Sequence, residues 1–333
     1  MENNFNETEH QENLEKEFAM TQQQKNAPLG SIDMGTLTGA DEHRLTAEQT
    51  AEIQRNFGGG FMSIKMTSLP SKGMFYQDKT EITVRGCTVK EVRDFSTIDE
   101  SDVVSINDHI KYILSNCIRV RIGNYMGSYK DLMECDKWYV LLFIRDLTFP
   151  HHENRIMMPV ISRTCASKDC GGQKEVELTH DILQFEEFDE KIIKYYDNIG
   201  KVLNVETKSF GVLPFYMPTV GVVEAVQNYT NDENENIDLS TAQMLPFLFD
   251  DWRKLNNDVL KQKCVEVAGY GAKLFALKYR MAEEINKVVG GMKSEITVPC
   301  TAGDGEVTCQ FSFQNGIREL FVPSLSSLAD ELV

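Results

Sequence analysis

Apolar and polar residues begin to alternate at Phe61, and the alternation continues to Met66. A period of two residues is typical of a β-strand, because successive side chains point to opposite faces. A turn is predicted at Leu69–Gly73, which combines proline, serine and glycine, and strand character returns at Ile82 and Val84. The sequence therefore predicts that folded structure starts near residue 61 with a small β region.

Two helices are predicted to follow. The first covers Ser105 to Cys117, with Ser105 or Asn107 available as its N-cap. Its apolar residues recur at the spacing of one helix face: Ile106, Ile110, Ile113, Leu114 and Cys117. The second covers Tyr129 to Leu147 and has two apolar faces, formed by Leu132, Cys135, Tyr139 and Leu142 and by Val140, Ile144 and Leu147. Two apolar faces imply that this helix is buried between neighbours.

The spacing of apolar residues changes from helical to mainly strand-like in residues 156–210. Short strands are predicted at Ile156–Val160 and Val176–Leu178, around a turn at Cys165–Gly172, and Asp181–Tyr196 has a partly helical pattern. We interpret this stretch as a small β module inserted in a helical context.

The C-terminal third is predicted to be mainly helical after Pro218. Apolar residues from Trp252 to Val289 recur at three, four and seven, which indicates a long amphipathic helix or a hairpin of two. Gly269 and Gly271 mark where such a helix would break. A β-like piece, residues 295–313, closes the pattern.

Together these patterns predict an α+β protein with a mainly helical core, an inserted small β module resembling a zinc ribbon, and a disordered N-terminal arm. The expected regions are a disordered acidic arm at 1–55, an α+β region at 56–155, the cysteine-bearing β module at 156–210, and a helical region with a terminal β piece at 211–333. The arm is assigned from composition, because the first fifty residues hold ten acidic and three basic side chains. A segment this polar buries too little apolar surface to offset the conformational entropy that it would lose on folding.

Charge narrows the expected partners. The chain has 51 acidic and 34 basic residues, a formal net charge of −17. A surface that neutralises phosphates is not expected on such a molecule, so nucleic acid is excluded as a partner. There is no apolar run of membrane-spanning length, and the first ten residues lack the order of a signal peptide. We expect no membrane partner and a location in the cytosol.

Four of the eight cysteines are candidate metal ligands: Cys165, Cys170, Cys300 and Cys309. Thiolates bind zinc well, and glycines follow Cys170 as in a metal-binding turn. Together the four could complete one tetrahedral structural zinc site, with His180 as a replacement ligand if Cys309 faces away. Four reduced cysteines or a local disulfide are the alternatives. The other four are expected to be small buried hydrophobes: Cys87, Cys117, Cys135 and Cys264.

No catalytic motif is present. The sequence lacks a Gly-x-Ser-x-Gly elbow, a His-Glu-x-x-His helix and a dinucleotide fingerprint. His151 and His152 have no partner at a useful spacing, and the acidic cluster at 186–190 is typical of a solvated face. We therefore expect no enzymatic activity.

Several segments resemble a known family in their order along the chain. Leu69–Tyr76 (LPSKGMFY), Ile82–Arg85 (ITVR) and Val89–Glu91 (VKE) are followed by helices at Ile110–Cys117 and Asp136–Arg145 (DKWYVLLFIR). This order resembles the baseplate hub subunit family of T-even-type contractile-tailed bacteriophages, over about residues 61–323. The first and last of these segments are its more specific parts.

That family often carries a Cys-x-x-Cys-Gly knuckle in the inserted module and a second one near the end. Here the first is stretched to Cys165 and Cys170, and Gly303 stands where the second cysteine of the other knuckle would be. The resemblance implies a baseplate hub protein, a structural component of the contractile tail or its assembly, whose partners are hub, tape-measure or wedge proteins. The alternative is a tail assembly chaperone that binds the tape-measure protein and is absent from the mature virion. Either would be found in the host cytoplasm during assembly, and a structural component also in the tail baseplate.

Overall fold

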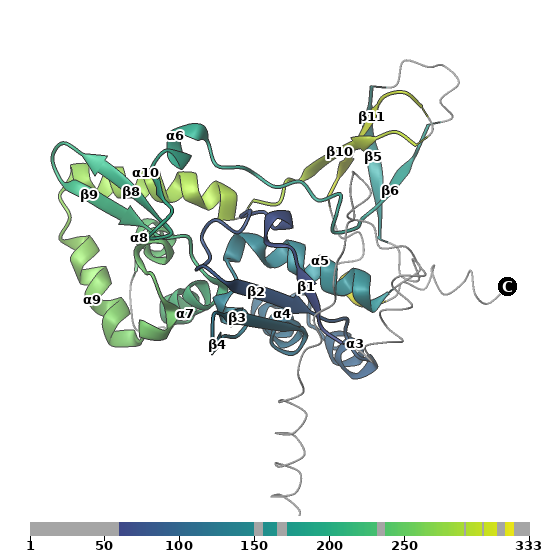
Figure 1. The fold of residues 1–333 in the computed structure, drawn as a ribbon, viewed down its shortest axis with the longest axis horizontal. Helices are drawn as coiled ribbons and strands as arrows, with labels where there is room; N and C mark the ends of the chain where they lie inside the picture. The colour runs from purple at the N-terminus through teal and green to yellow at the C-terminus, as the bar shows by residue number, and fades with distance from the viewer. Residues whose placement is uncertain are drawn as a thin grey trace, which may run out of the picture. The chain divides into compact units, whose positions relative to one another are not determined.

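The computed structural model describes residues 60–149, 156–164, 172–231, 237–289, 291–301, 303–311 and 317–322. Within them the protein is a mixture of helix and strand in which helix predominates (Figure 1). The predicted arm at 1–55 lies outside the described residues, as do His151 and His152.

The first sheet is antiparallel, with the strand order β1-β2-β3-β4. Its strands are β1 (Met62–Ile64), β2 (Thr80–Val84), β3 (Ile118–Ile122) and β4 (Tyr125–Met126). Strand character was predicted at Ile82 and Val84, and both are fully buried on β2. Helices α3 (Val89–Phe95) and α4 (Val103–Cys117) lie between β2 and β3 in the chain. Val84 pairs with Ile118, so the residues after β2 lie beside the end of α4.

The two predicted N-terminal helices differ in how far the prediction holds. Helix α4 is confirmed, although its N-cap is Asp102, whose side chain accepts from the Val104 N–H. The second helix, α5 (Lys137–Thr148), is buried on both sides as expected, but it begins eight residues later than predicted. Two short 3-10 turns, η2 (Tyr129–Asp131) and η3 (Glu134–Asp136), stand in its place, separated by extended backbone at Leu132 and Met133.

Hydrogen bonds to a distant segment explain that late start. The Leu132 carbonyl accepts from the Val220 N–H at 2.8 Å, and the Glu134 N–H donates to the Pro218 carbonyl at 3.0 Å. Met133 and Thr219 form a β-bridge between these bonds. The extended backbone satisfies its polar groups across the chain rather than along a helix.

The second sheet joins the cysteine-bearing module to the C-terminal β piece. Its order is β10-β11-β5-β6, and its strands are β5 (Met157–Arg163), β6 (Glu175–Glu177), β10 (Glu295–Pro299) and β11 (Glu306–Gln310). The central pairing is β11 with β5, two strands far apart in sequence. The expected boundary at residue 210 therefore separates two halves of one sheet, while a zinc-ribbon module as such is not shown.

A third sheet, order β7-β8-β9, follows in the chain. Its strands are β7 (Tyr196–Asp197), β8 (Val202–Thr207) and β9 (Gly211–Phe215). The partly helical pattern predicted at 181–196 corresponds to one short helix, α6 (Glu190–Ile193).

The C-terminal region is helical as predicted. Its helices are α7 (Val220–Asn231), α8 (Leu239–Met244), η5 (Leu245–Leu248), η6 (Trp252–Lys254), α9 (Asn257–Ala268) and α10 (Ala272–Val289), and η7 (Ile317–Leu320) follows the second sheet. One further 3-10 turn, η1 (Met66–Ser68), lies near the start of the chain. The stretch from 252 to 289 contains two main helices that meet at Gly269–Gly271, so the predicted break is confirmed. No helix in the described part of the chain is long and apolar enough to cross a membrane.

Candidate functional site

The predicted zinc ligands fall in two groups. Cys165 and Cys170 lie outside the described residues. Cys300 and Cys309 are buried in the second sheet, at the end of β10 and on β11. Their mutual position is therefore the part of the predicted site that the structure describes.

The pairing of β10 with β11 separates Cys300 from Cys309. Cys309 lies opposite Ile296, whereas Cys300 lies at the other end of the hairpin, where its N–H donates to the Gly305 carbonyl at 2.9 Å. Four residues of strand correspond to about 13 Å. Two sulfur ligands of one zinc ion are only about 3.8 Å apart, because each Zn–S bond is about 2.3 Å. These two cysteines are therefore not ligands of the same ion in this structure.

Cys300 lies at the same end of the second sheet as Thr164 and Gln173, which precede Cys165 and follow Cys170 in the chain. The Thr164 N–H donates to the Glu306 carbonyl at 2.9 Å. The Gln173 side chain accepts from the Thr301 N–H at 3.0 Å. A metal site that joins Cys300 to Cys165 and Cys170 stays a prediction.

His180, the proposed replacement ligand, is engaged elsewhere. Its Nδ1 lies 2.7 Å from Asp146 Oδ2, and its backbone N–H donates to the same oxygen at 2.9 Å. The imidazole also packs against Phe143, with ring centroids 4.5 Å apart, and against Tyr139. These contacts give His180 a role in anchoring the segment after β6 to α5.

A different cluster brings together Cys87, Glu91 and Cys117. The two sulfur atoms are 3.8 Å apart, and Cys117 Sγ is 3.9 Å from Glu91 Oε2. Within the described ranges this is the group of cysteine, histidine and acidic side chains whose ligand atoms lie close enough to hold a metal ion. The sulfur separation equals the edge of a tetrahedral thiolate site, about 3.8 Å. The cluster could hold a thiophilic ion, with the Glu91 carboxylate as an oxygen ligand.

The sequence prediction missed this cluster because it treated Cys87 and Cys117 as isolated buried hydrophobes. Strand pairing brings them together, since the Arg85 N–H donates to the Cys117 carbonyl at 3.0 Å. The available signal was that one cysteine shortly follows a predicted strand at Val84 and the other ends a predicted helix. That signal is useful only once β2 and β3 are known to be neighbours.

Glu91 is the most constrained member of the cluster. Arg85 donates to both of its oxygens, at 2.6 and 2.8 Å, and the Thr88 N–H donates to Oε2 at 2.7 Å as part of a capping box at the start of α3. Burial alone would raise the pKa of Glu91, but the hydrogen bonds from Arg85 and Thr88 outweigh it and lower the pKa to about 2. This carboxylate is ionised and has a structural role with or without a metal.

The thiol of Cys117 stays protonated. Its hydrogen bond with Cys87, its burial and the nearby negative charge all raise its pKa far above the ordinary value. Only a thiolate binds a metal, so an ion would have to displace this proton. The cluster is therefore a place where a soft ion could bind, rather than a site prepared for nucleophilic chemistry.

A second buried carboxylate, Asp136, connects two segments 60 or more residues apart. It accepts hydrogen bonds from the Ser71 N–H at 2.8 Å, the Ser71 hydroxyl at 2.7 Å and the Tyr76 hydroxyl at 2.8 Å. Asp136 has no exposed surface, and Tyr76 in turn accepts from the Met133 N–H at 2.9 Å. The turn at residues 69–76 contains two residues with positive φ, Lys72 and Gly73. Glycine adopts a positive φ without strain. The turn at residues 69–76 is thus fixed to the start of α5.

Comparison of the chain with protein-family models, curated proteins and solved structures finds no match to any of them.

Proposed function

We propose that this chain is a non-catalytic baseplate hub protein of a T-even-type contractile phage tail, with other tail proteins as its partners. One observation carries the proposal. The two most specific segments of the resemblance, Leu69–Tyr76 and Asp136–Arg145, meet around the buried Asp136 carboxylate. Segments that belong to one family pattern are expected to share one structural unit, and a chance similarity of short segments carries no such expectation.

The net charge of the chain fits a protein that works among other proteins. A net charge of −17 keeps a subunit soluble before assembly and attracts basic partners.

The position of the chain in the particle tests this proposal. Quantitative mass spectrometry of purified virions is expected to find the protein at a small fixed copy number, matching tail symmetry, relative to sheath and tube proteins. Absence from virions together with abundance in the infected lysate would contradict a structural role. That result would instead support the alternative, a tail assembly chaperone that binds the tape-measure protein.

We also propose that the protein binds one structural zinc ion. Cys165 and Cys170 would supply two ligands, and Cys300 would supply a third, because it lies at the same end of the sheet as Thr164 and Gln173, which flank the two cysteines in the chain. Serine at any of these three positions is expected to lower the zinc content and to lower the melting temperature by several degrees, because a closed thiolate site contributes folding free energy. Metal analysis and thermal unfolding of the purified variants measure both effects.

Cys309→Ser is the matched control, because Cys309 is also buried, even more fully than Cys300, but lies at the far end of the hairpin. Its zinc content should equal that of the wild type even if its stability falls. A melting temperature that a chelator leaves unchanged would contradict the zinc site.

A further inference from the structure

One face of the first sheet lies at the surface of the protein. Side chains along its strands alternate between two faces, as in an antiparallel sheet with one face on the core. One set belongs to the hydrophobic core: Ile64, Ile82, Val84, Ile118 and Val120. The alternate positions form the other face, which we call the outer face: Ser63 on β1, Glu81 and Thr83 on β2, Arg119 and Arg121 on β3, and Met126 on β4. Of these six, Thr83 is half-buried and the other five are exposed.

The outer face is cationic on a chain that is acidic overall. Strand β3 contributes two guanidinium groups, Arg119 and Arg121, whereas the acidic side chain of the face is Glu81. Glu81 pairs with Arg121 at 2.5 Å, and both side chains are half exposed. This pair offsets one positive charge and leaves that of Arg119. Because the chain has a net charge of −17, the outer face attracts anions that the molecule as a whole repels.

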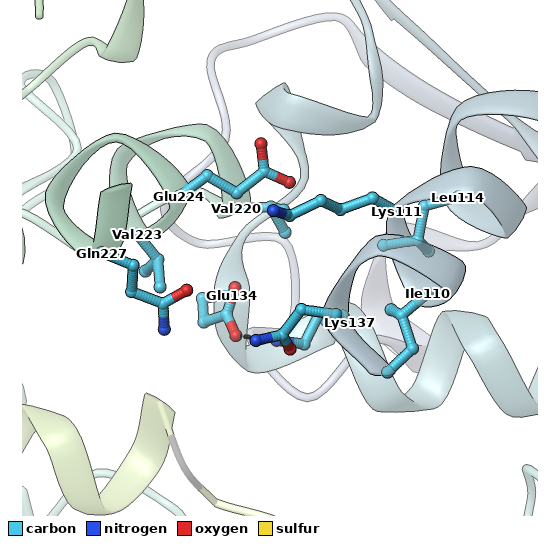
Figure 2. A pocket seen from close by; sticks show the side chains of 10 residues that line it. Ile110, Lys111, Leu114, Glu134, Lys137, Val220, Val223, Glu224 and Gln227 are labelled. Atoms are coloured by element: carbon cyan, nitrogen blue, oxygen red, sulfur yellow. Dashed lines mark hydrogen bonds and ion pairs between the residues drawn. The ribbon is translucent and has the colours of Figure 1, made fainter. Parts of the chain in front are cut away.

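Arg119 differs from other cationic side chains of this protein in having no acidic partner. Figure 2 shows the more usual arrangement between α4, η3 and α7, where Lys137 donates to Glu134. The Arg119 guanidinium makes no ion pair and no hydrogen bond with the residues that the structure describes. It lies over the Phe61 ring instead, 3.9 Å from the ring centroid. This contact holds the guanidinium in place and leaves its N–H groups available to a ligand.

Two hydroxyl groups lie in the same row of the outer face as Arg119. Thr83 on β2 pairs with Arg119 on β3, and Ser63 on β1 pairs with Thr83. Paired residues of neighbouring strands have their Cβ atoms about 5 Å apart. Neither hydroxyl makes a hydrogen bond with the residues that the structure describes. A guanidinium and two hydroxyls in one row of a sheet are a preorganised set of donors for an anion.

The spacing of the two arginines indicates the form of the ligand. Arg119 and Arg121 are two residues apart on one strand, so their side chains leave the sheet on the same side, about 7 Å apart. Alternate side chains of an extended peptide have the same spacing. A carboxylate accepts two parallel hydrogen bonds from one guanidinium, and Arg121 has enough donors to bind Glu81 and a ligand together. The methylene groups of a bound acidic side chain can pack on Met126, which is 61% exposed.

A nucleic acid is also anionic, but it fits the outer face less well. Its binding depends on the neutralisation of several phosphates at once, and this face has a single arginine without an acidic partner. A long row of phosphates would also extend past the face onto a molecule with a net charge of −17. A short peptide with two carboxylates avoids both costs.

We infer that the outer face binds an extended acidic segment of a partner protein, whose alternate carboxylates pair with Arg119 and Arg121. Ser63 and Thr83 donate to the carboxylate that Arg119 binds. The inference stands on the first sheet and holds whether or not the chain belongs to a phage tail.

Methyl NMR of the full chain tests the inference at the face itself. The protein, labelled at the methionine methyls, is titrated with the acetylated peptide amide Ser-Glu-Ser-Glu-Ser, which is expected to shift the Met126 signal in a saturable way. The peptide Ser-Gln-Ser-Gln-Ser has nearly the same shape and should bind at least fivefold more weakly, because it lacks the charge. The peptide Ser-Ser-Glu-Glu-Ser has the same charge and should also bind more weakly, because adjacent side chains of an extended chain point to opposite sides.

Arg119→Gln should weaken binding of the first peptide about fivefold, which corresponds to the loss of an exposed ion pair worth about 1 kcal/mol. Arg93→Gln is the control, because it also removes one positive charge but lies on the exposed surface of α3, beside Asp94. Its affinity should change less than twofold. Both variants should keep the wild-type melting temperature to within a few degrees, so a lost affinity is not a lost fold.

Three results would overturn the inference: no saturable shift of the Met126 signal, equal binding of the three peptides, or an equal loss of affinity in the two variants. Tighter binding of single-stranded hexathymidylate than of the first peptide would also overturn it, and would assign the outer face to nucleic acid.

Discussion

Asp136→Ala is expected to lower the free energy of unfolding by about 3–5 kcal/mol, the largest effect of any single substitution considered for this protein. The substitution removes the acceptor for the Ser71 N–H, the Ser71 hydroxyl and the Tyr76 hydroxyl. All three donors would then be buried without a partner, since Ser71 and Tyr76 are 3% and 5% exposed. Burial raises the pKa of Asp136, and the hydrogen bonds from Ser71 and Tyr76 oppose that rise. These donors therefore stabilise the carboxylate in the core. Urea unfolding followed by circular dichroism measures the change.

Two further variants make this result specific. Asp136→Asn keeps one carbonyl acceptor, so its loss of stability should be smaller than that of the alanine variant. Asp250→Ala removes an aspartate whose pair with Lys254 is half exposed, and it should cost less than about 1 kcal/mol. An alanine variant of Asp136 no less stable than that of Asp250 would show that the turn at 69–76 does not depend on this carboxylate.

Glu91→Gln is expected to lower the free energy of unfolding by about 2–4 kcal/mol, because it leaves the largely buried Arg85 guanidinium without its counter-charge. It also weakens the capping box at Thr88, which contributes about 1 kcal/mol in favourable cases. The matched control is Glu81→Gln. Glu81 also pairs with an arginine, Arg121, but both side chains are half exposed, so the expected cost is below about 1 kcal/mol.

The same carboxylate predicts a pH dependence with a definite sign. The pKa of Glu91 is about 2 in the folded protein and near 4.5 in the unfolded chain, so the unfolded state binds the proton more readily. The stabilisation is complete above the unfolded value and is lost as the pH falls toward 2. The stability difference between wild type and Glu91→Gln should therefore be constant above about pH 6 and shrink steadily toward pH 3. A difference that grows on acidification would contradict the pairing with Arg85.

The local pattern of apolar residues was enough to predict an element whose structure depends on its own side chains. The spacing of Ile110, Ile113 and Leu114 predicted α4, and these residues are buried on it. The break between α9 and α10 was predicted from Gly269 and Gly271 for the same reason.

Local pattern failed where distant backbone decides the structure. The apolar residues at 129–136 fit a helix, but hydrogen bonds with Pro218 and Val220 hold Leu132 and Met133 extended. The candidate sites have the same origin. Cys87 meets Cys117 through the pairing of β2 with β3, and Ser71 meets Asp136 through hydrogen bonds across 65 residues. Neither contact follows from the local pattern around either residue.

The pairing of β11 with β5 also sets an order of events during synthesis. While the ribosome is still adding the residues before Glu295, the residues of β5 and β6 have been synthesised but those of β11 have not. The edge of β5 that β11 will cover then presents unpaired N–H and C=O groups to other nascent chains. Closing this sheet needs contacts between residues 144 to 149 positions apart in the chain, which form slowly and late. Docking of the C-terminal hairpin onto β5 is thus the step that protects the newly made protein from edge-to-edge aggregation. This protection matters most in a cell that produces many copies of the protein at once.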